Sequence, residues 1–318
     1  MAPAGGPPLQ RRLRWRLEGA AAAAAVAVLR RLSPEAASAV AAAVCALIGP
    51  HTAKGAKARD NLRFVVPHAD RRELDRLVRG LFASLGRAAA ELVLLERLWR
   101  ERTQRLVFEA DPAAAEAVAR GGPAVFVTAH VGAWQLGSLI GAHYGLPFAA
   151  VYTPESNPHL ERLLARLRQG FRAEPIASRG GVRKLLALLR AGCSVGLAVD
   201  TRLDAGALIP FFGVPAPTNT VPARLALACR CPLVPVRAER LAGGRYRIRL
   251  EAPIAPPSGE ADSRAAAEQM TAALNARFEA WIAADPRQWV CLKRRWPKGA
   301  APGPLPAAGG PRQGPPPE

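Results

Sequence analysis

AVFVTAHVGAWQLGSLIGAHYG, residues 124–145, is the stretch that decides the fold of this chain. Its first six residues are apolar, β-branched or aromatic and follow the turn Gly121-Gly122-Pro123, which predicts a buried strand. Residues 134–142 carry apolar side chains at helical spacing, which predicts a helix. His130 stands between the two elements. A side chain at the end of such a strand faces a crevice, and the backbone N–H groups of the helix start point towards it.

His130 is the first candidate for chemistry. A neutral imidazole can take a proton from a hydroxyl near pH 7, because its ordinary pKa is about 6.5. Such a base needs a partner for its other ring nitrogen, and Gln135 follows about one helical turn later. From this stretch alone, a structural histidine is an equally good interpretation, so the rest of the chain must decide.

Strands alternate with helical segments along most of the remaining chain. This alternation predicts an α/β fold whose sheet has helices on both faces. Asp200 directly follows one predicted strand, and the carboxyl ends of parallel strands meet at one sheet edge, so Asp200 should lie on the same sheet edge as His130 if both strands are parallel. After the first strand, the predicted strands span residues 146–152, 173–178, 194–199 and 232–239, the last continuing through a hairpin to residue 250.

The charge of the chain points to anionic partners. The 318 residues carry a net charge of +19, and only five of the 44 basic residues are lysines. Arginine favours phosphate contacts because its planar fork binds two oxygens. A membrane surface, lipid phosphates or an acidic carrier protein fit this charge. Nucleic acid is not expected, because the chain has no zinc-finger spacing, no RNP-like aromatic motif and only 6% aromatic residues.

The cysteines indicate neither disulfides nor a metal site. They are odd in number, scattered and mostly inside apolar runs, and the spacing of the closest pair fits no common zinc site. We expect reduced core residues in a reducing compartment and no bound metal. The five are Cys45, Cys193, Cys229, Cys231 and Cys291.

The two ends of the chain differ from its middle. Residues 1–10 and 298–318 are rich in Pro and Gly and are expected to be disordered. Residues 11–50 begin with an arginine cluster and continue in two Ala-rich apolar runs, each shorter than the roughly 18 uncharged residues of a clear membrane span. We expect a retained interfacial anchor on an anionic leaflet. A signal peptide and an ordinary helical pair packed on the body are the alternatives.

Six motifs occur in a fixed order, and with them the chain resembles the late acyltransferases of lipid A biosynthesis, of the glycerolipid acyltransferase type. The resemblance covers roughly residues 54–297 and is more specific than any single motif. The motifs are ARDNL at 58–62, HVGAWQL at 130–136, Asn157-Pro158 before a helix that carries Arg168, Asp200-Thr201, PFFGVPAPT at 210–218 and PRQW at 286–289.

The resemblance implies a mixed, largely parallel sheet flanked by helices, with residues 51–297 as the acyltransferase domain. It implies transfer of an acyl chain from acyl carrier protein to a hydroxyl of a lipid A precursor, without metal or cofactor, at the cytoplasmic face of the inner membrane. The implied catalytic residues are His130, Gln135, Asp200 and Arg168. Substrate contacts are expected from Arg179, Arg202, Phe211, Phe212, Gly213 and Arg240. Residues 207–220 should form a stiff apolar loop that lines an acyl channel or simply covers the core, and the spacing of the loop from His130 and Asp200 favours the channel.

Gln135 departs from the family pattern. The family motif typically reads HFGNWEL, in which a carboxylate orients the histidine and stabilises its charged form, whereas an amide brings no charge. Loss of that charge in the Asp–His pair of a serine protease costs about 10⁴ in rate. Asp200 could supply the missing negative charge. Two alternatives therefore stay open: a low-activity or inactive lipid-binding protein, and an acyltransferase for another membrane lipid.

Overall fold

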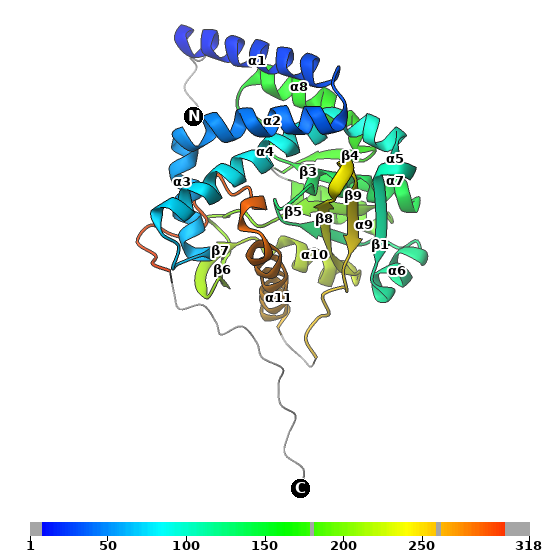
Figure 1. Cartoon of the computed structure of the whole chain (residues 1–318). Helices are drawn as coiled ribbons and strands as arrows, with labels where there is room; N and C mark the ends of the chain where they lie inside the picture. The colour runs from blue at the N-terminus through cyan, green and yellow to red at the C-terminus, as the bar shows by residue number, and fades with distance from the viewer. Residues whose placement is uncertain (1–7, 179–180, 259–261, 303–318) are drawn as a thin grey trace.

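A seven-stranded sheet forms the centre of the computed structural model, which describes residues 8–178, 181–258 and 262–302 (Figure 1). The strand order is β1-β9-β8-β2-β5-β3-β4. Neighbouring strands run parallel except β8 and β9, which form an antiparallel hairpin, so the predicted mixed, largely parallel sheet is confirmed. The strands are β1 (Leu106–Ala110), β2 (Val125–Thr128), β3 (Phe148–Tyr152), β4 (Glu174–Ala177), β5 (Ser194–Ala198), β8 (Leu233–Arg240) and β9 (Tyr246–Leu250).

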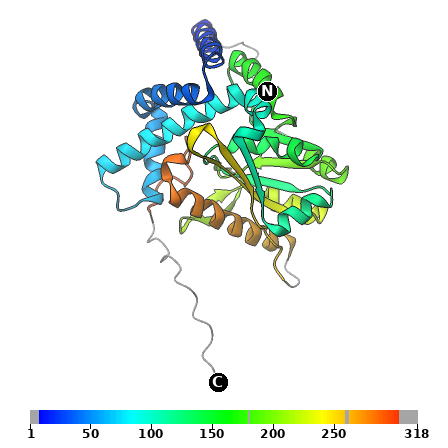
Figure 2. The same cartoon turned by 45° about the vertical axis from the view of Figure 1, so that its right-hand side comes forward.

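Both faces of the central strand β2 are buried, as its apolar run predicts. Val125 and Val127 pack with one half of the core, under α9, α10 and α11. Phe126, on the other face, packs with the half that α4 and α6 cover. Figures 1 and 2 show α4 and α11 on opposite sides of the sheet. The sequence pattern does not reveal β1, because this edge strand is short and carries a charged residue, Glu109.

The helices enclose this sheet and extend beyond it at the N-terminal end. The longest, α4, is capped by Asp70, whose carboxylate accepts from the backbone N–H of Glu73 at 2.7 Å. The helices are α1 (Leu9–Leu29), α2 (Pro34–Ile48), α3 (Ala53–Val65), α4 (Arg71–Arg100), α5 (Arg102–Arg105), α6 (Pro112–Ala119), α7 (Ile140–Tyr144), α8 (Pro158–Arg168), α9 (Gly181–Arg190), α10 (Val221–Cys229) and α11 (Ser263–Ala284), with short 3₁₀ turns η1 (Gly49–His51), η2 (Trp134–Leu139), η3 (Gln169–Phe171), η4 (Ala242–Gly244) and η5 (Pro286–Gln288).

Two local predictions are wrong. The segment after His130 is not one α-helix but η2 followed by α7. Its turns are tightened by Ser138, whose hydroxyl donates to the carbonyl of Gln135 at 2.7 Å. Residues 207–220 are not a loop but mainly a hairpin of β6 (Ala207–Phe211) and β7 (Val214–Thr218), closed by Phe212 and Gly213, both at positive φ. A two-stranded hairpin tolerates its three prolines because both strands are edges.

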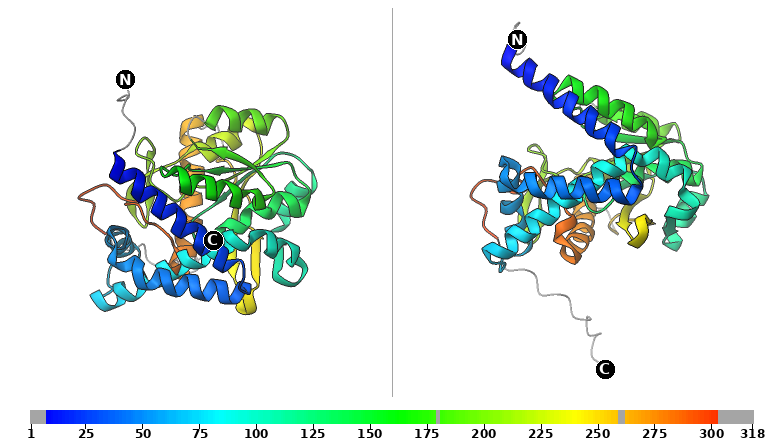
Figure 3. Two further views of the ribbon diagram at one scale, coloured as in Figure 1. Left: turned by 90° about the horizontal axis from the view of Figure 1, so that it is seen from above. Right: turned by 45° about the horizontal axis from the view of Figure 1, so that its top comes forward.

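The N-terminal helices are ordered against the body. Leu9 and Gln10, which the sequence predicts to be disordered, belong to α1. Helix α1 lies alongside α8 (Figure 3), and α2 packs on α4. Residues 1–7 and 303–318 lie outside the described residues. Within the described part, no single helix has the length and composition to cross a membrane, whereas α2 with η1, together with α3, passes by length and composition as a pair bent by 87°.

Candidate active site

His130 and Asp200 meet at the carboxyl edge of the sheet. Strands β2 and β5 are parallel neighbours, with Thr128 opposite Ala198, and each residue of the pair lies two positions beyond its strand. Nδ1 of His130 is 2.6 Å from Oδ1 of Asp200, and the same oxygen accepts from the backbone N–H of His130 at 3.1 Å. The prediction that both residues lie on the same sheet edge is confirmed.

The carboxylate of Asp200 is fully enclosed. Its second oxygen accepts from the indole N–H of Trp289 at 2.8 Å, so hydrogen bonds hold both oxygens. Burial raises the pKa of Asp200, but His130 and the hydrogen bonds from His130 and Trp289 outweigh it, and the net shift is downward. Asp200 is therefore ionised near neutral pH and can only accept hydrogen bonds.

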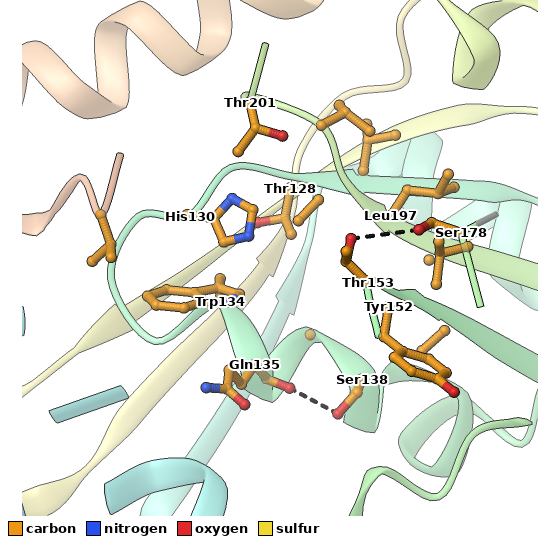
Figure 4. A pocket seen from close by; sticks show the side chains of 18 of the residues that line it. Thr128, His130, Trp134, Gln135, Ser138, Tyr152, Thr153, Ser178, Leu197 and Thr201 are labelled. Carbon is orange, nitrogen blue, oxygen red and sulfur yellow. Dashed lines mark hydrogen bonds between the residues drawn. The ribbon is translucent and has the colours of Figure 1, made fainter. Parts of the chain in front are cut away.

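This carboxylate sets the state of the imidazole. Because an ionised carboxylate accepts only, Nδ1 of His130 carries the proton, and Nε2 is left as the basic nitrogen. Burial lowers the pKa of His130, but the charge of Asp200 outweighs it and the net shift is upward, with Lys293 opposing. The side chain of His130 is 28% exposed, and its ring meets that of Trp134 edge-on at 5.4 Å (Figure 4).

Gln135 does not reach the imidazole. Its side-chain amide points away from the His130 ring (Figure 4) and donates to the carbonyl of Ala88 on α4 at 3.0 Å. The structure thus does not bring together the two residues that the motif pairs. Gln135 ties η2 to α4, and Asp200 is the acidic partner of His130.

A cavity of about 740 Å³ opens beside His130. Its wall combines residues of β2, β3 and β5 with residues of η2 and α8 (Figure 4). The buried apolar residues of its wall include Phe126, Ile140 and Phe148. The ring of Phe148 lies over Gly196, where a Cβ would come within 2.7 Å of it. Such a cavity suits an extended hydrocarbon chain whose reacting end lies at the imidazole.

Two of the predicted basic residues line the same cavity. Arg168 is buried, donates to Glu161 at 2.9 Å and places its guanidinium 4.0 Å from the ring centre of Tyr152. Arg202 donates to the backbone carbonyl of Trp296 and pairs with Asp204. Arg179 lies outside the described residues.

The other predicted substrate contacts are not on the cavity wall. Arg240 forms a buried ion pair with Glu91 at 2.5 Å and also donates to the carbonyl of Gly132 at 2.9 Å, so it braces the loop after His130. Phe211 and Phe212 are buried in the core, and Gly213 closes the hairpin. The hairpin therefore supports the site from behind, because its apolar side chains bury against α11 and Trp289 instead of facing a channel.

Sequence reasoning assigned no role to three residues of the site. Lys54 and Lys293 line the cavity, and Trp289 holds Asp200. The available signal for the lysines was their rarity in an arginine-rich chain. Among the described residues, no group of three or more His, Cys, Asp or Glu side chains could hold a metal ion.

Residues 11–298 match the model of the family described as bacterial lipid A biosynthesis acyltransferase. The chain belongs to this family. It is 24% identical over 246 residues to a protein of Haemophilus influenzae named lipid A biosynthesis acyltransferase, an alignment that covers 74% of this chain and 73% of the relative.

Solved structures give one further comparison for this acyltransferase. The crystal structure of the 1-acyl-sn-glycerophosphate acyltransferase of Thermotoga maritima aligns at 13% identity and a TM-score of 0.35, covering 69% of this chain and 86% of the other.

Proposed function

We propose that this acyltransferase moves a fatty acyl chain from acyl carrier protein to a hydroxyl of a lipid A precursor, with His130 as general base. The observation that carries the proposal is the His130–Asp200 pair, with His130 on the wall of a cavity that is partly lined by buried apolar side chains. Membership of the family supports acyl transfer to a lipid. The pair supplies the charge that Gln135 lacks, which favours a working enzyme over an inactive lipid-binding protein.

The chemistry follows from the proton positions. Nε2 of His130 removes the proton of the acceptor hydroxyl while its oxygen attacks the thioester carbonyl. Asp200 stabilises the imidazolium that forms. The tetrahedral intermediate carries a negative charge, and the basic side chains of Arg168, Lys293 and Arg202 on the cavity wall favour it. When the intermediate collapses, the carbon–sulfur bond breaks and the imidazolium returns the proton to the leaving thiolate.

Helix α1 exposes a stripe of leucine side chains. Leu9, Leu13 and Leu17 recur every four residues on α1 and are 81%, 58% and 64% exposed. The opposite face of α1 packs on α8, where the side chain of Asn157 donates to the carbonyl of Trp15 at 3.1 Å. We propose that this apolar stripe, flanked by arginines, lies in the anionic cytoplasmic leaflet of the inner membrane and brings the cavity to its lipid.

The test is a reconstituted transfer assay. Purified protein is incubated with acyl–acyl carrier protein and an under-acylated lipid A precursor, and the products are identified by mass spectrometry. We expect one added acyl chain, and no product from His130→Ala although its circular dichroism and melting match the native protein. His68→Ala, an exposed histidine outside the cavity, is the control and should keep full activity.

A second acceptor series separates the remaining alternatives. Lysophospholipids are offered with the same donor. Product with these and none with the lipid A precursor would move the proposal to another membrane lipid. No product with any acceptor would support a protein that binds lipid without turnover.

A further inference from the structure

Trp289 has a contact that its family motif does not explain. Its side chain is fully buried, with Phe211 and Trp296 edge-on at ring-centre distances of 5.9 and 6.2 Å. Packing alone would need only an apolar ring here. Its indole N–H nevertheless points at Oδ2 of Asp200, 2.8 Å away.

The backbone around Trp289 is joined to the catalytic loop as well. Trp289 forms a β-bridge with Val131, and the N–H of Val290 donates to the carbonyl of His130 at 2.8 Å. The segment after η5 therefore contacts both members of the pair: the backbone of His130 and the carboxylate of Asp200.

The two oxygens of Asp200 are held unequally. Oδ1 accepts both N–H groups of His130, whereas Oδ2 has Trp289 as its donor among the described residues. A carboxylate that loses the donor on one oxygen can rotate about its terminal bond, because that torsion is broad. Rotation would take Oδ1 off the line to Nδ1. The hydrogen bond on Oδ2 thus decides whether the bond on Oδ1 keeps its geometry.

We infer that Trp289 is a positioning residue of the proposed acyl transfer: its indole N–H locks the carboxylate of Asp200 in the orientation that holds the imidazole of His130. The inference rests on the proposed function for its rate consequences. The structural consequence of the inference, a change in the titration of His130, does not depend on the proposed function.

Removal of the indole N–H should change that titration in one direction. When the carboxylate of Asp200 turns away, its hydrogen bond to Nδ1 and its charge raise the pKa of His130 less, so that pKa falls towards its ordinary value. The other charged or titratable groups that act on the pair are Lys293, Cys291 and Arg295, all on the segment after Trp289. The variants below retain all three, so they do not alter the comparison.

Trp289→Phe removes the donor, and Trp296→Phe is the matched control. Trp296 is equally buried in the same aromatic cluster, and its indole N–H donates at 3.1 Å to the backbone carbonyl of Phe211, not to the catalytic pair. Both changes remove one buried indole N–H and the same volume. A purely structural role predicts that the two variants lose stability and activity alike.

We expect Trp289→Phe to lower kcat about 10- to 100-fold and to move the acid limb of kcat/KM downward by about half to one pH unit, because the hydrogen bond between Asp200 and the imidazolium is weakened and not lost. Trp296→Phe should leave the acid limb unmoved. The titration of the His130 imidazole, followed by ¹⁵N NMR with specifically labelled histidine, should show the same difference without any substrate.

The outcomes separate the two proposals. If the native enzyme transfers acyl chains but both variants share the native acid limb and the native His130 titration, the positioning role is wrong and the proposed function stands. If native turnover is absent, the proposed function fails, and the NMR titration still decides the inference. If either phenylalanine variant fails to fold, 3-benzothienylalanine at position 289 preserves the ring shape and lacks the N–H. An unshifted His130 in that protein would overturn the inference.

Discussion

Asp200→Asn is the sharpest perturbation of the site, because the amide cannot satisfy the donors that the carboxylate satisfies. Three N–H groups face Asp200: the backbone and ring N–H of His130 and the indole of Trp289. If the amide oxygen faces His130, the amide NH₂ meets the indole N–H. If the amide turns round, its NH₂ meets His130, and Nδ1 must become an acceptor. Nε2 then carries the proton and cannot serve as the base.

The expected size follows from these two orientations. The first leaves two buried donors opposed, and each unsatisfied buried donor costs about 1–3 kcal/mol. The second has the wrong tautomer, which costs about 10⁴ in rate in the serine-protease precedent. We therefore expect kcat/KM to fall about 10²- to 10⁴-fold, which is about 2.7–5.5 kcal/mol of transition-state stabilisation.

The assay is steady-state transfer from acyl–acyl carrier protein, with thermal unfolding measured in parallel. Asp75→Asn, which removes one charge from a surface ion pair with Arg59, is the control for the substitution itself and should keep native activity. Combining Asp200→Asn with Trp289→Phe removes the opposed indole, so the double variant should lose less than the product of the two single losses. An Asp200→Asn enzyme that is folded and fully active would refute the assigned role of the carboxylate.

Three further outcomes are expected. Gln135→Glu should change the rate less than about twofold, because His130 already has its partner in Asp200. It should lower the free energy of unfolding in denaturant by about 1–3 kcal/mol, because the carboxylate cannot donate to the α4 carbonyl that the amide reaches; a tenfold gain in rate would contradict this prediction. Only the neutral imidazole acts as base, and the charge of Asp200 outweighs the burial that lowers the pKa of His130. A pH series of kcat/KM should therefore rise to a plateau with its midpoint above the ordinary value of 6.5; a midpoint below 6.5 would count against the pair. Replacing Leu13 and Leu17 by Glu should weaken co-flotation with anionic vesicles by at least about tenfold, since each leucine contributes about 1.5–3 kcal/mol on burial, whereas Leu208→Glu on the exposed hairpin should not; equal flotation of both proteins would remove α1 from membrane binding.

Local patterns in the sequence determined the strand–turn–helix order of the domain and the positions of its reactive side chains. The apolar run before His130 has to be buried on both faces, and the run before Asp200 likewise. Parallel strands bring their carboxyl ends to one edge, so a shared edge for His130 and Asp200 could be predicted once both strands were recognised, whereas the direct pairing of β2 with β5 came from the tertiary structure. The helix starts at Ser33 and Asp70 could be predicted for a similar reason, since capping is local.

Only the tertiary structure decided which partner each side chain takes. The spacing of the motif placed Gln135 near His130, but the 3₁₀ turns of η2 and a carbonyl of α4 direct its amide elsewhere. Arg240 was expected at a substrate, yet Glu91, about 150 residues away along the chain, binds it. Trp289 reaches Asp200 across a separation of 89 residues. Periodicity reports which face of an element is buried, but it carries no information on which distant donor meets a given acceptor, because that depends on how the packed elements are placed relative to one another.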